Sequence, residues 1–212
     1  MTILAAKFLQ TGAIERASRL ARCTRGVAAI EFAMVLPIMV LMYLGSTELT
    51  FGVSVDRKLT LVSRTLADLT SRTPTMTLPV MTTILDASRA VMAPYKSDNL
   101  NMVVSSVVVA DTGTKKPDGS PVLQGKVCWS QASGPGATAL AKNTVVPLPD
   151  GFNTAKTSFI QAEVQMPYRA MFSSAIFKTI MSSDTITLSE KTPWPVRNVA
   201  EVIFQGTPAC LT

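Results

Sequence analysis

The sequence contains no histidine among its 212 residues. Histidine is the commonest general base in enzymes and the commonest metal ligand, so its absence argues against most acid–base catalytic sites and most zinc sites. The nucleophile elbow Gly-x-Ser-x-Gly, the phosphate-binding P-loop and the Cys-x-x-Cys pair are missing as well. We therefore expect a protein that is not an enzyme and that uses no metal and no cofactor.

Charge is also scarce, because charged residues make up 16% of the chain and apolar residues 47%. This balance favours a membrane-anchored protein over a cytosolic enzyme. The formal net charge is +6, but residues 1–26 hold five bases and one acid, which leaves +2 for the rest of the chain. The basic balance therefore predicts no nucleic-acid partner. Membrane topology and anionic lipid explain the N-terminal bases better.

One long run, Val27–Leu44, is almost wholly apolar, and Glu31 is its only charged residue. As a helix with a rise of about 1.5 Å per residue it spans roughly 27 Å, close to the thickness of a bilayer's hydrocarbon core. The charged residues that precede this run are Lys7, Glu15, Arg16, Arg19, Arg22 and Arg25. Positive charge beside a span stays in the cytoplasm. We expect a single-pass protein of the inner (cytoplasmic) membrane, with a cytoplasmic N-terminus and a periplasmic or extracellular C-terminal domain. A cleavable signal peptide ending near Gly45–Thr47 is the competing interpretation.

The start of the apolar run carries a second pattern: a basic leader, Gly26, four apolar residues and then Glu31. This combination resembles the class III signal of type IV pilin-like proteins, in which a prepilin peptidase cuts after the glycine. The segment Arg25–Ala33 with Val35–Pro37 resembles the opening of the TadE-like proteins of tight-adherence (Tad, or Flp) pilus systems. Those proteins are pseudopilins or minor pilins. A weaker match to the family lies downstream at Val164–Arg169, Ile186–Ser189 and Arg197.

The resemblance implies a pilin-like subunit that is cut between Gly26 and Val27 and then serves the assembly of a Tad pilus. It also implies the partners, namely a prepilin peptidase, other pilin-like subunits, the pilus assembly platform and the membrane. Glu31 lies one helical turn after Val27, so its carboxylate faces the new α-amino group of its own or of an adjacent subunit. In the bland interpretation Glu31 lies at headgroup depth and reaches water.

A function of another class stays open. The chain also fits an inner-membrane-anchored extracytoplasmic binding protein or adhesin that is never cleaved and that holds a partner with its outer domain. Cleavage at Gly26 separates the two interpretations.

The helical period continues beyond the apolar run. Apolar residues recur there at steps of four and three, at Val55, Leu59, Val62, Leu66 and Leu69. We predict one long helix from about Val27 to Leu69 and three parts of the chain: a basic leader 1–26, a transmembrane and amphipathic helix 27–72, and an outer domain 73–212. A second helix is expected over Pro79–Ala93, with Thr77 as its N-cap.

The remaining residues predict strands. Their expected ranges are Met102–Ala110, Val122–Ser130, Phe159–Met166, Thr185–Glu190 and Val199–Phe204. Asp111–Ser120 reads as a long hairpin tip, and 168–181 as a short apolar helix or loop. In Phe159–Met166 the glutamines and Glu163 alternate with apolar residues, which predicts a half-buried strand. The expected fold class is α+β, with the long N-terminal helix packed on an antiparallel sheet of about four or five strands.

Three cysteines complete the inventory. Cys23 lies in the leader, on the reducing side of the membrane, and is expected to be a free thiol. Cys128 and Cys210 lie on the oxidising side, one in a predicted strand and the other near the C-terminus. We predict that they form a disulfide that holds the tail on the sheet. Trp129, beside Cys128, is expected in the core.

Overall fold

The computed structural model describes residues 26–169 and 185–211. The chain divides into two compact units, residues 1–48 and residues 49–212. One continuous helix, α2 (Val27–Ser71), runs from the first unit into the second and contains Pro37. A proline inside a helix removes one backbone hydrogen bond. The helix continues where neighbouring groups satisfy the freed backbone carbonyl. The single long helix expected from the sequence is thus confirmed, and it extends to Ser71.

In the second unit, α3 (Leu78–Ala90) follows a short strand, β1 (Thr75–Met76). The side-chain oxygen of Thr77 accepts a hydrogen bond from the Val80 N–H at 3.4 Å, so Thr77 is the N-cap that the sequence predicts. The helix ends at Ala90, three residues before the expected end at Ala93, and turns carry the chain onward to Pro94.

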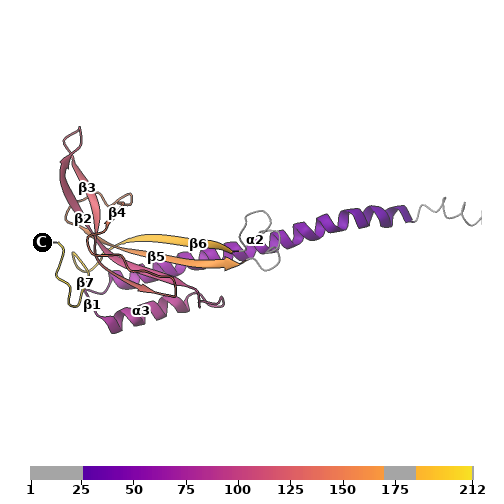
Figure 1. Ribbon diagram of the computed structural model, residues 1–212, viewed down its shortest axis with the longest axis horizontal. Coiled ribbons are helices and arrows are strands. Elements are labelled where there is room, and N and C mark those ends of the chain that lie inside the picture. The colour runs from indigo at the N-terminus through magenta and orange to yellow at the C-terminus, as the bar shows by residue number, and fades with distance from the viewer. Residues whose placement is uncertain (1–25, 170–184, 212) are drawn as a thin grey trace, which may run out of the picture. The chain divides into compact units, whose positions relative to one another are not determined.

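A five-stranded antiparallel sheet forms the centre of the second unit, in the order β4-β3-β2-β5-β6 (Figure 1). Its strands are β2 (Asn101–Lys115), β3 (Pro121–Ser133), β4 (Val145–Val146), β5 (Ser158–Arg169) and β6 (Thr185–Pro195). A separate two-stranded parallel sheet joins β1 to β7 (Ile203–Phe204). The predicted α+β class and the antiparallel sheet are confirmed.

The main core lies between one face of the sheet, called the inner face here, and the helices α2 and α3. Its buried side chains from α2 include Val55, Leu59, Val62 and Leu66, and those from the strands include Met102, Val104, Ile160 and Val164. Burying each such aliphatic side chain contributes about 1.5–3 kcal/mol. The hydroxyl of Ser63 lies 2.8 Å from that of Thr192 and 3.3 Å from the backbone oxygen of Ala162, so α2 is also tied to β5 and β6 through hydrogen bonds.

The opposite, outer face of the sheet carries a second and smaller core. Its buried side chains are Val107, Val109, Val127, Val146 and Phe159. Residues after β3 cover them, and the ring of Phe152 lies 4.5 Å from that of Phe159. The expectation of a half-buried β5 is therefore wrong at its first half, where Gln161 on the outer face is only 3% exposed. The sequence pattern does not reveal the loop that covers this face.

The hairpin between β2 and β3 is tighter than predicted. The strands extend to Lys115 and from Pro121, and these two residues pair beyond an irregularity that follows Asp111. The turn closes through a hydrogen bond from the Lys116 N–H to the Ser120 oxygen at 2.8 Å. The Ser120 hydroxyl, and then its backbone N–H, donate to Asp118 and hold the pKa of that exposed carboxyl below its ordinary value of 3.8.

Three further expectations need correction. β6 is longer than predicted and runs to Pro195, whereas the strand expected over Val199–Phe204 keeps only its last two residues. Ile186, expected to face inward, is 39% exposed because it pairs with Tyr168 at the end of the sheet, beyond the core side chains. The helix or loop expected over 168–181 lies outside the described residues from 170 onward, and Tyr168 and Arg169 end β5.

Candidate functional site

Within the first unit, residues 27–43 form the exposed and apolar start of α2. All residues from 26 to 43 are exposed, and the most apolar window of α2 has a mean hydropathy of 2.2 with none of it buried. Within the described part of the chain this is the single helix long and apolar enough to cross a membrane. Moving apolar side chains out of water lowers the free energy, and no other described part of the protein buries this stretch. The helix therefore fits a single-pass membrane anchor, whose side chains contact lipid.

Glu31 lies in this helix, four residues after Val27, where the helix begins. Four residues rise about 6 Å and return to nearly the same helix face. The Glu31 side chain is exposed, and no hydrogen bond or ion pair of its carboxylate occurs among residues 26–169 and 185–211. It is also the only charged residue between Gly26 and Thr47. A lone carboxylate in an apolar span is costly, so such a residue is by default a candidate for a functional position.

Gly26 directly precedes the helix. A Cβ atom added to it would meet no heavy atom within 4 Å. Packing against the described residues therefore does not require a glycine at this position. The cysteine of the leader, Cys23, lies outside the described residues.

In the second unit, Cys128 on β3 and Cys210 near the C-terminus are joined by a disulfide, with their Cα atoms 6.0 Å apart. Beside it the buried carboxylate of Glu201 accepts the N–H groups of Cys210, at 2.9 and 3.1 Å, and of Leu211, at 2.9 Å. These three side chains lie close enough to suggest a metal site, but sulfur atoms in a disulfide are not thiolate ligands. The disulfide and Glu201 therefore hold the C-terminal tail in place, and we call them the clasp. Glu201 was not identified from the sequence, since an isolated glutamate carries no local signal of this role.

Trp129 extends this clasp. Its indole N–H donates to the backbone oxygen of Val202 at 2.7 Å, and its ring lies 5.4 Å from that of Phe204. The tryptophan is 5% exposed, as its expected place in the core requires. The residues that precede the tail are thus fixed to β3 from two sides.

The two downstream segments that resemble the family lie side by side in the structure. Val164–Arg169 is the end of β5 and Ile186–Ser189 the start of β6, with Met166 opposite Leu188. Arg197 lies apart from them, with its guanidinium 3.3 Å from Asp68 of α2 and 5.7 Å from the ring centre of Trp194. The segments and the arginine therefore do not form one site.

The comparisons with known proteins concern the N-terminal part of the chain. No curated protein and no solved structure matches the chain. The family model described as TadE-like protein matches residues 26–68, which begin at Gly26 and include Glu31 and most of α2. TadE-like proteins are structural proteins associated with pili rather than enzymes. The match confirms the resemblance found in the sequence and identifies the segment 26–68 as TadE-like.

Proposed function

We propose that the chain is a pilin-like subunit, a pseudopilin or minor pilin, that serves the assembly of a Tad pilus. The observation that carries this proposal is the exposed apolar helix that begins directly after Gly26, holds Glu31 as its only charge, and lies in the TadE-like segment. In this proposal α2 anchors the precursor in the inner membrane with the leader in the cytoplasm. The second unit lies outside, where an oxidising compartment maintains the disulfide between Cys128 and Cys210.

A prepilin peptidase then hydrolyses the peptide bond between Gly26 and Val27. The cut removes the five leader bases that favour the cytoplasmic face and creates a new α-amino group on Val27. Such a group has an ordinary pKa of about 7.7–8.0 and is largely cationic near neutral pH. The absence of a glycine requirement within the described structure supports a peptidase cleft as the reason for Gly26.

Glu31 gives the new amine a counter-charge. When subunits pack side by side, its carboxylate pairs with the Val27 amine of the adjacent subunit and thereby sets the axial register between the two helices. A charge left unpaired in an apolar environment costs several kcal/mol, so only a matched register satisfies every subunit. The exposed apolar surface around Glu31 is the surface that such neighbours would cover.

The first experiment determines the N-terminal residue of the protein from cells with an intact peptidase, by mass spectrometry of the purified chain. We expect Val27 for the wild type and partial processing for Gly26→Ala. Gly26→Leu is expected to leave the full-length precursor in the membrane. Gly45→Leu is the matched control, because an added Cβ at Gly45 also meets nothing within 4 Å, and it should be processed normally. Mature protein that keeps residues 1–26 in cells with normal pili would refute the proposal and favour the uncleaved anchored binding protein.

The second experiment separates pairing from cleavage. Glu31→Ala should be cut like the wild type but should fail to support pilus assembly, seen as lost surface pili by electron microscopy. If Glu31→Ala is cut and assembles pili at the wild-type level, the pairing role is wrong while the cleavage site stands.

A further inference from the structure

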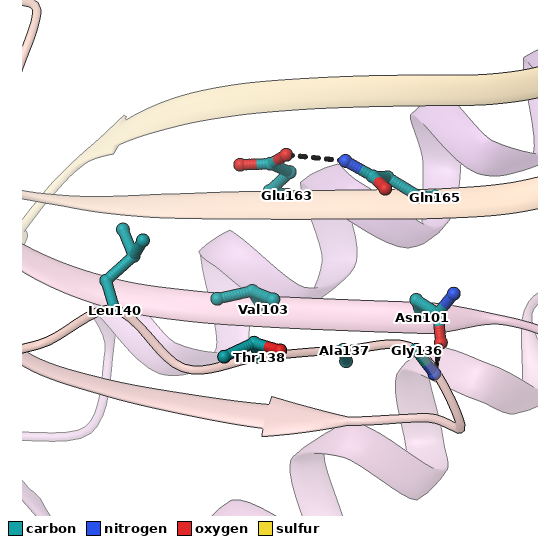
Figure 2. Close-up of a pocket in the computed structure, with 8 residues that line it drawn as sticks. All are labelled: Asn101, Val103, Gly136, Ala137, Thr138, Leu140, Glu163 and Gln165. Carbon is teal, nitrogen blue, oxygen red and sulfur yellow. Dashed lines mark hydrogen bonds between the residues drawn. The ribbon is translucent and has the colours of Figure 1, made fainter.

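The outer face of the sheet carries a groove, lined by both polar and apolar side chains, that the proposed function does not use. Figure 2 shows its first cavity, of about 170 Å³, between the outer side chains of β2 and β5 and the loop that follows β3. Val103 of β2 forms the floor. Glu163 and Gln165 of β5 form one wall, and Gly136, Ala137, Thr138 and Leu140 form the other. A second cavity of about 270 Å³ lies beyond Glu163, beside Gln161 and Lys191, and the rest of its lining is apolar: Pro147, Leu148, Pro149 and Pro193.

Hydrogen bonds fix the loop wall before any ligand arrives. The side-chain oxygen of Asn101 accepts the Gly136 N–H at 2.8 Å. The Ser130 hydroxyl accepts the Leu140 N–H at 3.0 Å and is itself bonded to the Ser105 hydroxyl at 2.9 Å. The loop is therefore attached to β2 and β3 at both of its ends. A wall that is already ordered costs little conformational entropy on binding.

The charge in this groove is balanced internally. Glu163 and Lys191 are the only charged residues that line the two cavities, and their charged atoms lie 3.6 Å apart. The Glu163 carboxylate also accepts a hydrogen bond from the Gln165 amide at 2.7 Å (Figure 2). The groove thus offers no unmatched charge to an ionic ligand, and it holds its carboxylate in one orientation.

Three polar side-chain groups in the groove are still able to hydrogen-bond a ligand. The Asn101 amide nitrogen, the Gln165 amide oxygen and the Thr138 hydroxyl make no hydrogen bonds within the described residues, and all three side chains border the same cavity. An amide presents a donor and an acceptor side by side, and each hydroxyl of a sugar is both. Val103 and Leu140 add an apolar surface for the C–H face of a ring. The backbone of β2 and β5 is already paired in the sheet, so it has little to offer an extended peptide.

We propose that this groove binds a neutral saccharide, with one ring in the cavity beside Gln165 and the chain continuing past the Glu163–Lys191 pair toward Gln161. The site lies on the sheet and shares no residue with Gly26, Val27 or Glu31. It would give the outer domain a ligand of its own, whether or not the chain is cleaved.

The test uses the full chain in phospholipid nanodiscs, because sugar-based detergents would compete for the groove. Binding is measured on immobilised neutral oligosaccharides of glucose, galactose, mannose and N-acetylhexosamines, beside uronic acid and sialylated oligosaccharides and a set of extended peptides. We expect at least one neutral oligosaccharide to bind, and Gln165→Leu to weaken it roughly five- to tenfold, as the loss of a hydrogen-bonding amide would. Gln124→Leu is the matched control on β3, outside both cavities, and should bind as the wild type does.

A second variant tests the charge argument. Glu163→Gln keeps the size of the side chain and its contact with Gln165 but leaves Lys191 without its carboxylate. We expect this variant to gain binding to the acidic oligosaccharides by several-fold. Circular dichroism and thermal unfolding verify that every variant is folded.

Four outcomes would overturn the proposal. The wild type binds no neutral oligosaccharide of the panel; it binds only the acidic ones or only the peptides; Gln165→Leu and Gln124→Leu bind equally; or Glu163→Gln leaves the preference for neutral ligands unchanged.

Discussion

The clasp at the C-terminus makes a quantitative prediction. We consider the double variant Cys128→Ala/Cys210→Ala, which removes the disulfide and introduces no new polar group. The cross-link joins residues separated by 82 positions, and closing a loop of that size lowers the entropy of the unfolded chain by an amount worth about 4.5 kcal/mol at 25 °C. The double variant should lose most of this free energy of unfolding. For a domain of this size the loss lowers the melting temperature by roughly 10–18 °C.

The folded tail should nevertheless remain docked in the double variant. The Glu201 carboxylate still accepts the N–H groups of Cys210's replacement and of Leu211, and the Trp129 indole still donates to Val202. The change therefore acts mainly on the unfolded state. Glu201→Gln is the complementary variant, because it keeps the disulfide and weakens the charge-assisted hydrogen bonds; it should cost about 1–3 kcal/mol.

The assay is urea unfolding of the full chain in detergent micelles, followed by tryptophan fluorescence, with Trp129 in the core as the reporter. Wild type, wild type with a reductant, the double variant and Glu201→Gln are compared at one temperature. The reduced wild type and the double variant should agree. Non-reduced peptide mass spectrometry verifies the Cys128–Cys210 link in the starting material. If the double variant unfolds within about 1 kcal/mol of the oxidised wild type, the chain-entropy reasoning is refuted.

Three further predictions follow from single contacts and from topology. Ser63→Ala should lower the free energy of unfolding by roughly 1–2 kcal/mol, because the buried hydroxyl of Thr192 loses its partner at 2.8 Å; an unchanged urea midpoint would contradict this. Gly125→Ala should lower the free energy of unfolding by about 1–3 kcal/mol, because the added Cβ would lie 2.9 Å from a Val146 methyl carbon and 3.0 Å from the Val146 backbone oxygen. Gly45→Ala is the control and should show no such loss, because an added Cβ there meets no heavy atom within 4 Å. A reporter fused after Thr73 should be active only when it is of the kind that requires export, and activity of a cytoplasmic reporter there would overturn the proposed topology.

The elements that the sequence predicts well are those with a local cause. The helix α2 follows from a long apolar run and a helical period, both of which can be read in the local sequence. The N-cap at Thr77 follows from one side chain and a proline two residues later. The motif of Gly26 and Glu31 is equally local, and residues 26–68 match the TadE-like family.

The errors come from contacts between residues distant in the sequence. Gln161 has a polar side chain in an alternating strand, but the loop near Pro149 covers it, and nothing in the strand itself announces that cover. Glu201 stabilises the tail through the backbone N–H groups of Cys210 and Leu211, and nothing in the sequence around Glu201 announces that contact. The groove on the outer face likewise combines side chains from β2, β5 and a loop between them, so no single stretch of sequence contains it.

The cross-link between Cys128 and Cys210 also limits how far the protein can be stretched. When tension is applied between the N-terminal helix and the C-terminus, the chain between Cys128 and Cys210 cannot extend, because the disulfide joins its two ends. These cysteines are 82 positions apart in the sequence. A fully extended chain gains about 3.4 Å per residue, so the loop withholds roughly 280 Å of contour length. Strands β4, β5, β6 and β7 lie between the two cysteines in the sequence, and even complete unfolding leaves them inside the closed loop. A force applied to the C-terminus therefore passes through the disulfide directly to β3. It bypasses the strands that lie inside the closed loop.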